Sequence, residues 1–121
     1  MSTKTAITEA TTPKKLNLAI DYKHAKTDKD NTPNEEITAN YLRYFVNQKY
    51  PQGLQGQMMR IFGRLQVKLD DALEDGKKSI TLDAAEVDFV KKIFKDEEDL
   101  KFPAGESKYF VKFMDEITSL F

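Results

Sequence analysis

The stretch DALEDGKKSITLDAAEVDFV, residues 71–90, constrains the fold more than any other part of the chain. Gly76 follows a run of helical periodicity, at the position where a left-handed glycine commonly ends a helix. Asp83 and Glu86 have the spacing of a capping box, which predicts that a new helix begins after Asp83. The short β-branched segment between these signals, residues 79–82, is expected to be extended. Helix, extended link and helix therefore follow one another here.

The same stretch also resembles a calcium-binding EF-hand in its order of helix, acidic loop and helix. Such a loop needs oxygen ligands at positions 1, 3, 5 and 12 and a glycine at position 6. If Gly76 is placed at position 6, positions 3 and 12 are Leu73 and Leu82, which offer no side-chain oxygen. In the second candidate, DKDNTPNEEITA at 28–39, the sixth residue is a proline and the twelfth an alanine. We therefore expect no calcium site.

Composition excludes several other classes of site. The chain has no cysteine, which removes disulfides, thiolate zinc sites and cysteine nucleophiles, and His24 is its one histidine. A formal charge of −1 argues against a generally cationic nucleic-acid binder. No apolar run approaches the ~18 residues needed to span a bilayer, and the N-terminus lacks the apolar core of a signal peptide. We expect no cofactor, no metal and no membrane partner, and a cytoplasmic location.

The pattern of apolar residues divides the chain into three parts. Residues 1–15 are rich in threonine, with almost nothing to bury, and predict a disordered tail. Residues 16–32 predict an extended arm and a loop, because LNLAIDY at 16–22 alternates apolar and polar residues. The arm either packs on its own domain, which we favour, or adds to the sheet edge of another protein. A minor two-strand pairing of 16–22 with 79–82 is compatible with the first option.

Residues 33–121 predict a small four-helix domain, so the fold class is mostly α. Thr32, Pro33 and Glu35 suggest an N-cap, a first-turn proline and a capping-box acid for the first helix. The expected helices cover about 33–49, about 57–75, a segment that begins at 84, and about 103–120.

The second predicted helix carries an unusual charge pattern. Arg60, Arg64 and Lys68 recur at a spacing of four and form a basic ridge beside the apolar stripe, close to two glycines and the helix N-terminus. Acidic residues fill the last turns, which is the reverse of the order that the helix dipole prefers. The ridge is expected either to meet an acidic protein surface or phosphates, or to pair inside the fold with residues 96–99 or Glu106.

The first and last predicted helices have apolar faces wider than a single stripe. Tyr44 and Val46 widen the first, and Tyr109 and Val111 the last. One interpretation is that these helices are simply buried on two sides, as is common in small helical domains. The other is that the four side chains form a surface for self-association or for a partner.

Nothing in the sequence has the pattern of a catalytic centre. Adjacent carboxylates such as Asp70 and Asp71 do not face each other on a helix, and no phosphate-binding or dinucleotide-binding loop is present. The stretch from Tyr50 to Leu73 resembles small proteins encoded by tailed bacteriophages. That resemblance implies an accessory viral protein, located in the host cytoplasm or the virion.

The sequence therefore predicts a small non-enzymatic protein-binding module, such as an accessory, inhibitory or assembly factor. Its partner is expected to be another protein or a second copy of itself. The alternative is a nucleic-acid-binding protein that uses Arg60, Arg64 and Lys68 on phosphates. The predicted partner-binding residues are Gln55, Gln57, Arg60, Arg64, Lys68, Tyr44, Val46, Tyr109 and Val111.

Overall fold

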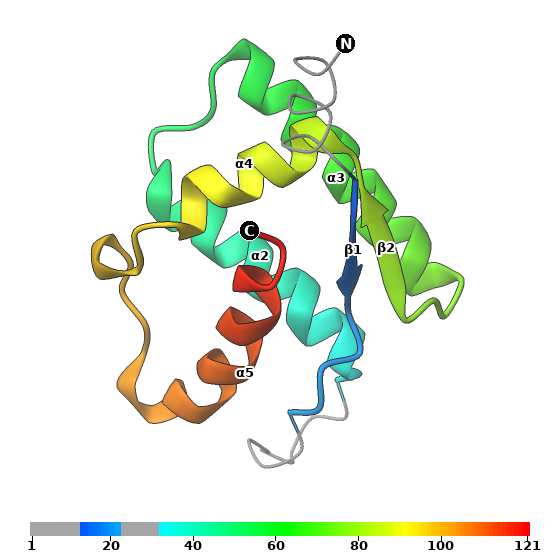
Figure 1. Ribbon diagram of the computed structural model, residues 1–121, viewed down its shortest axis with the longest axis vertical. Helices are drawn as coiled ribbons and strands as arrows, with labels where there is room; N and C mark the ends of the chain where they lie inside the picture. Colours follow the sequence, from blue (N-terminus) through cyan, green and yellow to red (C-terminus); the bar gives the residue numbers. More distant parts are fainter. Residues whose placement is uncertain (1–12, 23–31) are drawn as a thin grey trace, which may run out of the picture.

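The computed structural model describes residues 13–22 and 32–121 and shows a small, mostly α domain (Figure 1). In chain order the elements are β1 (Lys14–Asn17), α2 (Asn34–Lys49), α3 (Gly56–Glu74), β2 (Ser79–Leu82), α4 (Ala84–Phe94) and α5 (Ser107–Thr118), with single 3-10 turns at Glu97–Asp99 and Ala104–Glu106 before α5. The predicted four-helix fold with a minor strand pair is therefore confirmed within the described residues.

Much of the predicted tail and loop lies outside the described residues, including His24 and most of 1–15. Lys14 and Lys15, which the sequence reading placed in the tail, belong to β1 instead. The ordered arm therefore begins before residue 16.

The two strands form an antiparallel pair at one edge of the molecule, beside α3 (Figure 1). Leu16 lies opposite Ile80, and the backbone N–H of Leu18 donates to the carbonyl of Lys78 at 2.8 Å. The predicted pairing of the arm with 79–82 is confirmed, but the first strand ends at Asn17. Beyond Leu18 the arm leaves β2 and runs along the helices.

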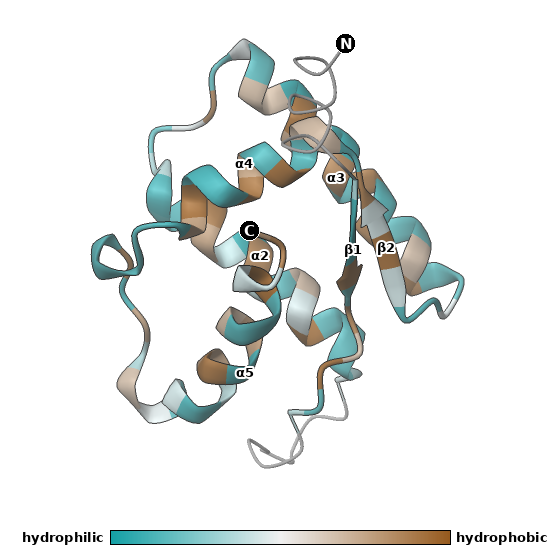
Figure 2. Cartoon of the chain, viewed as in Figure 1, coloured by the Kyte–Doolittle hydropathy of each residue, from teal (hydrophilic) through white to brown (hydrophobic). Residues whose placement is uncertain are grey.

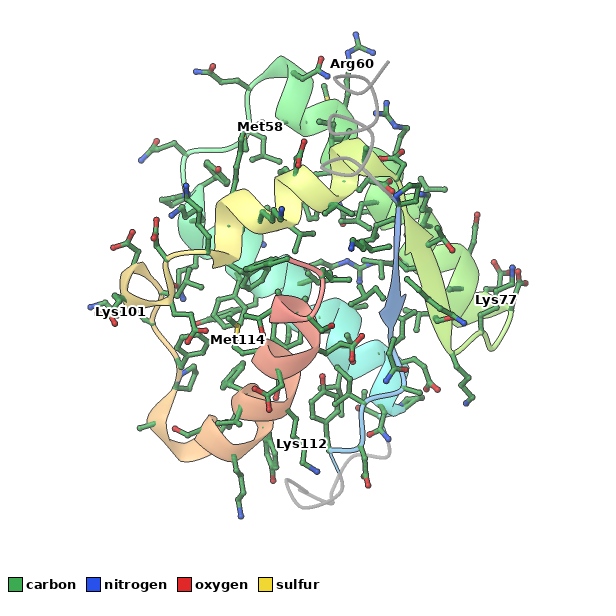
Figure 3. All side chains as sticks on the ribbon, in the orientation of Figure 1. Met58, Arg60, Lys77, Lys101, Lys112 and Met114 are labelled. Carbon is green, nitrogen blue, oxygen red and sulfur yellow. The ribbon has the colours of Figure 1, made fainter. Side chains whose placement is uncertain are left out.

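Helices α2 and α5 hold the rest of the arm. The Thr38 hydroxyl on α2 lies 2.8 Å from the Leu18 carbonyl oxygen and 3.0 Å from the Tyr22 hydroxyl. From α5, the Lys112 ammonium donates to the Asp21 carbonyl at 2.7 Å, and Lys112 is labelled in Figure 3. The alternating apolar side chains of the arm are buried: Leu16, Leu18, Ile20 and Tyr22. The arm thus packs on its own domain, which confirms the favoured alternative.

The signals around residues 71–90 were correctly interpreted. Gly76 has a φ of 69°, and the Lys77 N–H donates to the Ala72 carbonyl at 2.8 Å, which is the bond pattern of a Schellman cap. Asp83 and Glu86 form a reciprocal capping box at the start of α4. Because both motifs depend on residues close in sequence, local pattern alone was enough to find them.

The predicted capping box at the start of α2 is wrong. Pro33, not Thr32, occupies the N-cap position, and its carbonyl accepts from Glu36 N–H and Ile37 N–H. No side chain of the described residues caps this helix end. Glu35 instead accepts a hydrogen bond from the Lys78 ammonium at 2.8 Å, and this ion pair joins the first turn of α2 to the turn before β2.

A cluster of aromatic rings forms the centre of the core, between α2, α4 and α5. The Phe45 ring on α2 lies 5.6 Å from Phe94 and from Phe110, and 6.0 Å from Phe113, measured between ring centroids. A second contact, between Phe62 and Phe89, joins α3 to α4. Figure 2 shows hydrophilic colour on the turn Glu97–Asp99 after α4, whose residues are all exposed.

Candidate interaction surface

Arg60 and Arg64 project from α3 into solvent. Both side chains are exposed, and neither forms an ion pair with any residue that the structure describes. Figure 3 shows Arg60 pointing away from the body of the molecule, whereas Met58 packs inward against the core. The predicted internal pairing with residues 96–99 or Glu106 is therefore not formed.

Lys68, the third member of the predicted basic ridge, has a structural role instead. Its ammonium lies 2.5 Å from Glu86 Oε1 and also donates to the Thr81 carbonyl at 2.9 Å. Glu86 is fully buried, and its Oε1 also accepts from the Asp83 N–H, whereas Oε2 has no partner in the described part of the chain. Removing Lys68 would leave a buried carboxylate uncompensated. Its assignment as a partner contact is thus corrected, and the exposed ridge is reduced to Arg60 and Arg64.

Apolar side chains lie beside these arginines. Met59 is 52% exposed and Val67 is 58% exposed, two of the largest exposures of any large apolar residue in the described chain. Gly63 lies between them on the same side of the helix, because residues four apart share a helix face. We call Met59, Arg60, Gly63, Arg64 and Val67 the outer face of α3. Sequence reading missed Met59 and Val67, although their spacing of eight residues places them with Gly63.

Gly63 is not required by the packing of the described residues. Apart from the adjoining backbone of α3, no described atom would lie within 4 Å of a Cβ at this position. Glycine in a helix interior is less stable than alanine by about 0.5–1 kcal/mol. The glycine is therefore not needed for the close packing of another described helix, and the space beside its backbone is open.

Gln55 and Gln57 border the outer face at the start of α3. Gln55 is the N-cap residue, but its side chain makes no capping bond with the described residues. Gln57 is exposed in the first turn. Both side chains are thus placed where a molecule bound to the outer face would reach them.

The predicted residues of α2 and α5 separate into surface and core. Val46 is only 2% exposed and belongs to the core, so its assignment to a partner surface is corrected. Tyr109 is half-buried against the core, and Tyr44 and Val111 are exposed. Val111 borders a shallow cleft of about 290 Å³. The cleft is lined by Glu97, Phe102, Ser107, Phe110, Val111, Met114 and Asp115.

Tyr22 is buried in the core, and Tyr41 packs against it partly buried. Burial raises the pKa of Tyr22, and burial also raises the pKa of Tyr41 to about 12. Both therefore stay protonated near neutral pH.

In the described ranges, no group of three or more His, Asp or Glu side chains is placed to hold a metal ion. No helix among the described residues is long and apolar enough to cross a membrane.

Comparisons with known proteins identify no relative of this chain. No protein-family model matches the chain. No curated protein and no solved structure matches it either.

Proposed function

We propose that this chain is a small non-enzymatic protein-binding module whose binding surface is the outer face of α3. The observation that carries the proposal is that Arg60 and Arg64 are exposed beside exposed Met59 and Val67 and form no ion pair with a described residue. Arginine and methionine are enriched at protein interfaces relative to the rest of the surface. The resemblance of residues 50–73 to small phage proteins supports an accessory or assembly role, in the host cytoplasm or the virion.

A protein partner fits this face better than a nucleic acid. Phosphate binding gains affinity with each additional lysine or arginine that contacts the backbone. Lys68 is already bound to Glu86, and the exposed carboxylates of Asp71 and Glu74 follow on the same helix. Those carboxylates would repel a phosphate backbone that extended along α3. Nucleic acid remains the second candidate because Arg60 and Arg64 lie in the half of α3 whose dipole attracts phosphate.

The experiment is an affinity pull-down from source-cell lysate, with and without nuclease, read by mass spectrometry. Three forms are compared: the natural chain, Arg60→Glu/Arg64→Glu, and the control Lys92→Glu/Lys95→Glu. Lys92 and Lys95 are exposed at the end of α4, so the control changes net charge equally at another place. We expect a stoichiometric protein that survives nuclease, is lost with the arginine variant and is kept with the control.

Two other outcomes would contradict the proposal. Loss of all captured material after nuclease treatment would favour the nucleic-acid alternative. Equal capture by the natural chain and by Arg60→Glu/Arg64→Glu would show that the outer face of α3 is not the binding surface.

A further inference from the structure

One stripe of exposed residues on α3 has an ordered charge pattern. Arg60, Arg64, Val67, Asp71 and Glu74 recur at alternating spacings of four and three, which keeps them on one side of a helix. All five are exposed. Along the helix the stripe reads positive, positive, apolar, negative, negative. We call these five residues the charge stripe.

The charge stripe has no ionic counterpart among residues 13–22 and 32–121. None of its four charged residues forms an ion pair with a described residue. Arg60 and Glu74 are too far apart to meet along one helix, since fourteen residues span about 21 Å. The order of charges also opposes the helix dipole, at a cost of a few tenths of a kcal/mol per group. The described residues therefore supply no complement for the stripe, and a second molecule can supply one.

A reversed copy of the stripe is that complement. Arg60 and Glu74 lie equally far from Val67 in sequence, on opposite sides of it, and Arg64 and Asp71 nearly so. We propose that α3 pairs with α3 of a second copy, antiparallel, about a two-fold axis that passes near Val67. Each Arg60 then faces Glu74 of the second copy, and each Arg64 faces Asp71. Such an isologous contact uses the same patch on both subunits and closes as a dimer.

Gly63 leaves space for the two α3 helices to approach each other near the proposed two-fold axis. It lies one turn before Val67, and a Cβ there would meet no described atom within 4 Å outside the adjoining backbone of α3. Glycine at a helix contact lets the partner helix approach more closely than a larger residue would. A close approach at this point would bury the two Val67 side chains against each other.

This inference rests on the proposed function, because it names the partner of the outer face. The first test is a charge exchange measured by sedimentation velocity or light scattering. We expect a dimer for the natural chain, monomers for Arg60→Glu and for Glu74→Arg, and a restored dimer for Arg60→Glu/Glu74→Arg. Circular dichroism should show the same helix content in all four, since both side chains are exposed. Failure of the exchange to restore a dimer would overturn the pairing.

The second test uses the absence of cysteine from the chain. Val67→Cys and Val111→Cys are matched variants, because both valines are 58% exposed. Under mild oxidation at low protein concentration, Val67→Cys should form a covalent dimer, since a two-fold axis brings its two copies together. Val111→Cys should stay monomeric. Equal cross-linking of the two variants, or cross-linking of Val111→Cys alone, would rule out α3 as the contact.

The outcomes for the two proposals are distinguishable. A monomeric natural chain that still captures another protein through Arg60 and Arg64 would overturn the dimer and keep the proposed function. A monomeric chain with no arginine-dependent capture would overturn both.

Discussion

The region where the strands and the arm meet the helices differs from the outer face of α3, although both carry many charges. In the first region, Lys68, Lys112 and Glu116 each bond to a group on a different element of the fold. On the outer face, Arg60 and Arg64 reach no ionic partner among the described residues. Lys68 and Arg64 are one turn apart on the same helix. A charge therefore has a structural role only where the fold places a complementary group beside it.

Replacing Lys68 and Arg64 in turn tests this difference directly, and Lys68→Met should have the larger effect. It leaves the buried Glu86 carboxylate without its counterion, and we expect the free energy of unfolding to fall by about 3 kcal/mol. Arg64→Met should change it by less than about 0.5 kcal/mol, because the side chain is exposed. Chemical denaturation at pH 7 measures both values. Similar losses for the two variants would contradict the distinction between the regions.

Substitution of Thr38 should remove the hydrogen bonds that hold the arm on α2. Thr38→Val removes a buried hydroxyl that contacts both the Leu18 carbonyl and the Tyr22 hydroxyl. Leaving buried polar groups without partners should cost about 2 kcal/mol of unfolding free energy. Thr118→Val is the control, since Thr118 is exposed at the end of α5. The hydrogen-exchange rate of the Leu18 amide should rise in Thr38→Val and stay unchanged in Thr118→Val.

Gly63→Ala should change the stability of the domain and its self-association in opposite directions. With open space around this position, alanine should raise the unfolding free energy by about 0.5–1 kcal/mol through helix propensity. This is best measured in a Val67→Glu background, in which we expect the chain to be monomeric. In the otherwise natural chain, the same substitution should weaken self-association. A stabilised chain with unchanged association would place the contact away from Gly63.

A small effect is expected at the ion pair between Glu35 and Lys78. The hydrogen bond from Lys78 lowers the pKa of Glu35 below its usual value of 4.5. A lowered pKa gives stability that is present above the unfolded-state pKa and is lost as pH falls through the folded-state value. Glu35→Gln should therefore cost about 0.5 kcal/mol at pH 7, as for a surface pair. The difference from the natural chain should vanish in acid, and a difference that persisted there would contradict this origin.

Local motifs made much of the fold predictable, and distant contacts account for the errors. The end of α3 at Gly76 and the start of α4 after Asp83 were found because their signals lie within a few residues of each other. The role of Lys68 was not, since Glu86 is eighteen positions away on another helix. Val46 was likewise assigned to the surface because only tertiary packing determines that it is buried.

The same limit applies to the candidate surface. Arg60 and Arg64 were identified from their spacing, but that no described carboxylate pairs with them depends on where the acidic segments lie in space. Met59 and Val67 were missed because an exposed apolar residue and a buried one look alike in sequence. The position of Gly63 is visible in the sequence, but only the surrounding geometry shows that the space beside it is open.

Side chains that bind the outer backbone groups of β1 and β2 also lower the tendency of the small sheet to aggregate. A two-stranded sheet has two edges at which an added strand of another molecule can start a growing ladder. The Asn17 N–H on one edge is bound by the Glu116 carboxylate at 3.0 Å, and the Thr81 carbonyl on the other by the Lys68 ammonium at 2.9 Å. Lys14 and Lys15 add charge to the first edge. An incoming strand would have to displace these groups, so the small sheet resists fibril-like growth and leaves helix surfaces as the easier route to assembly.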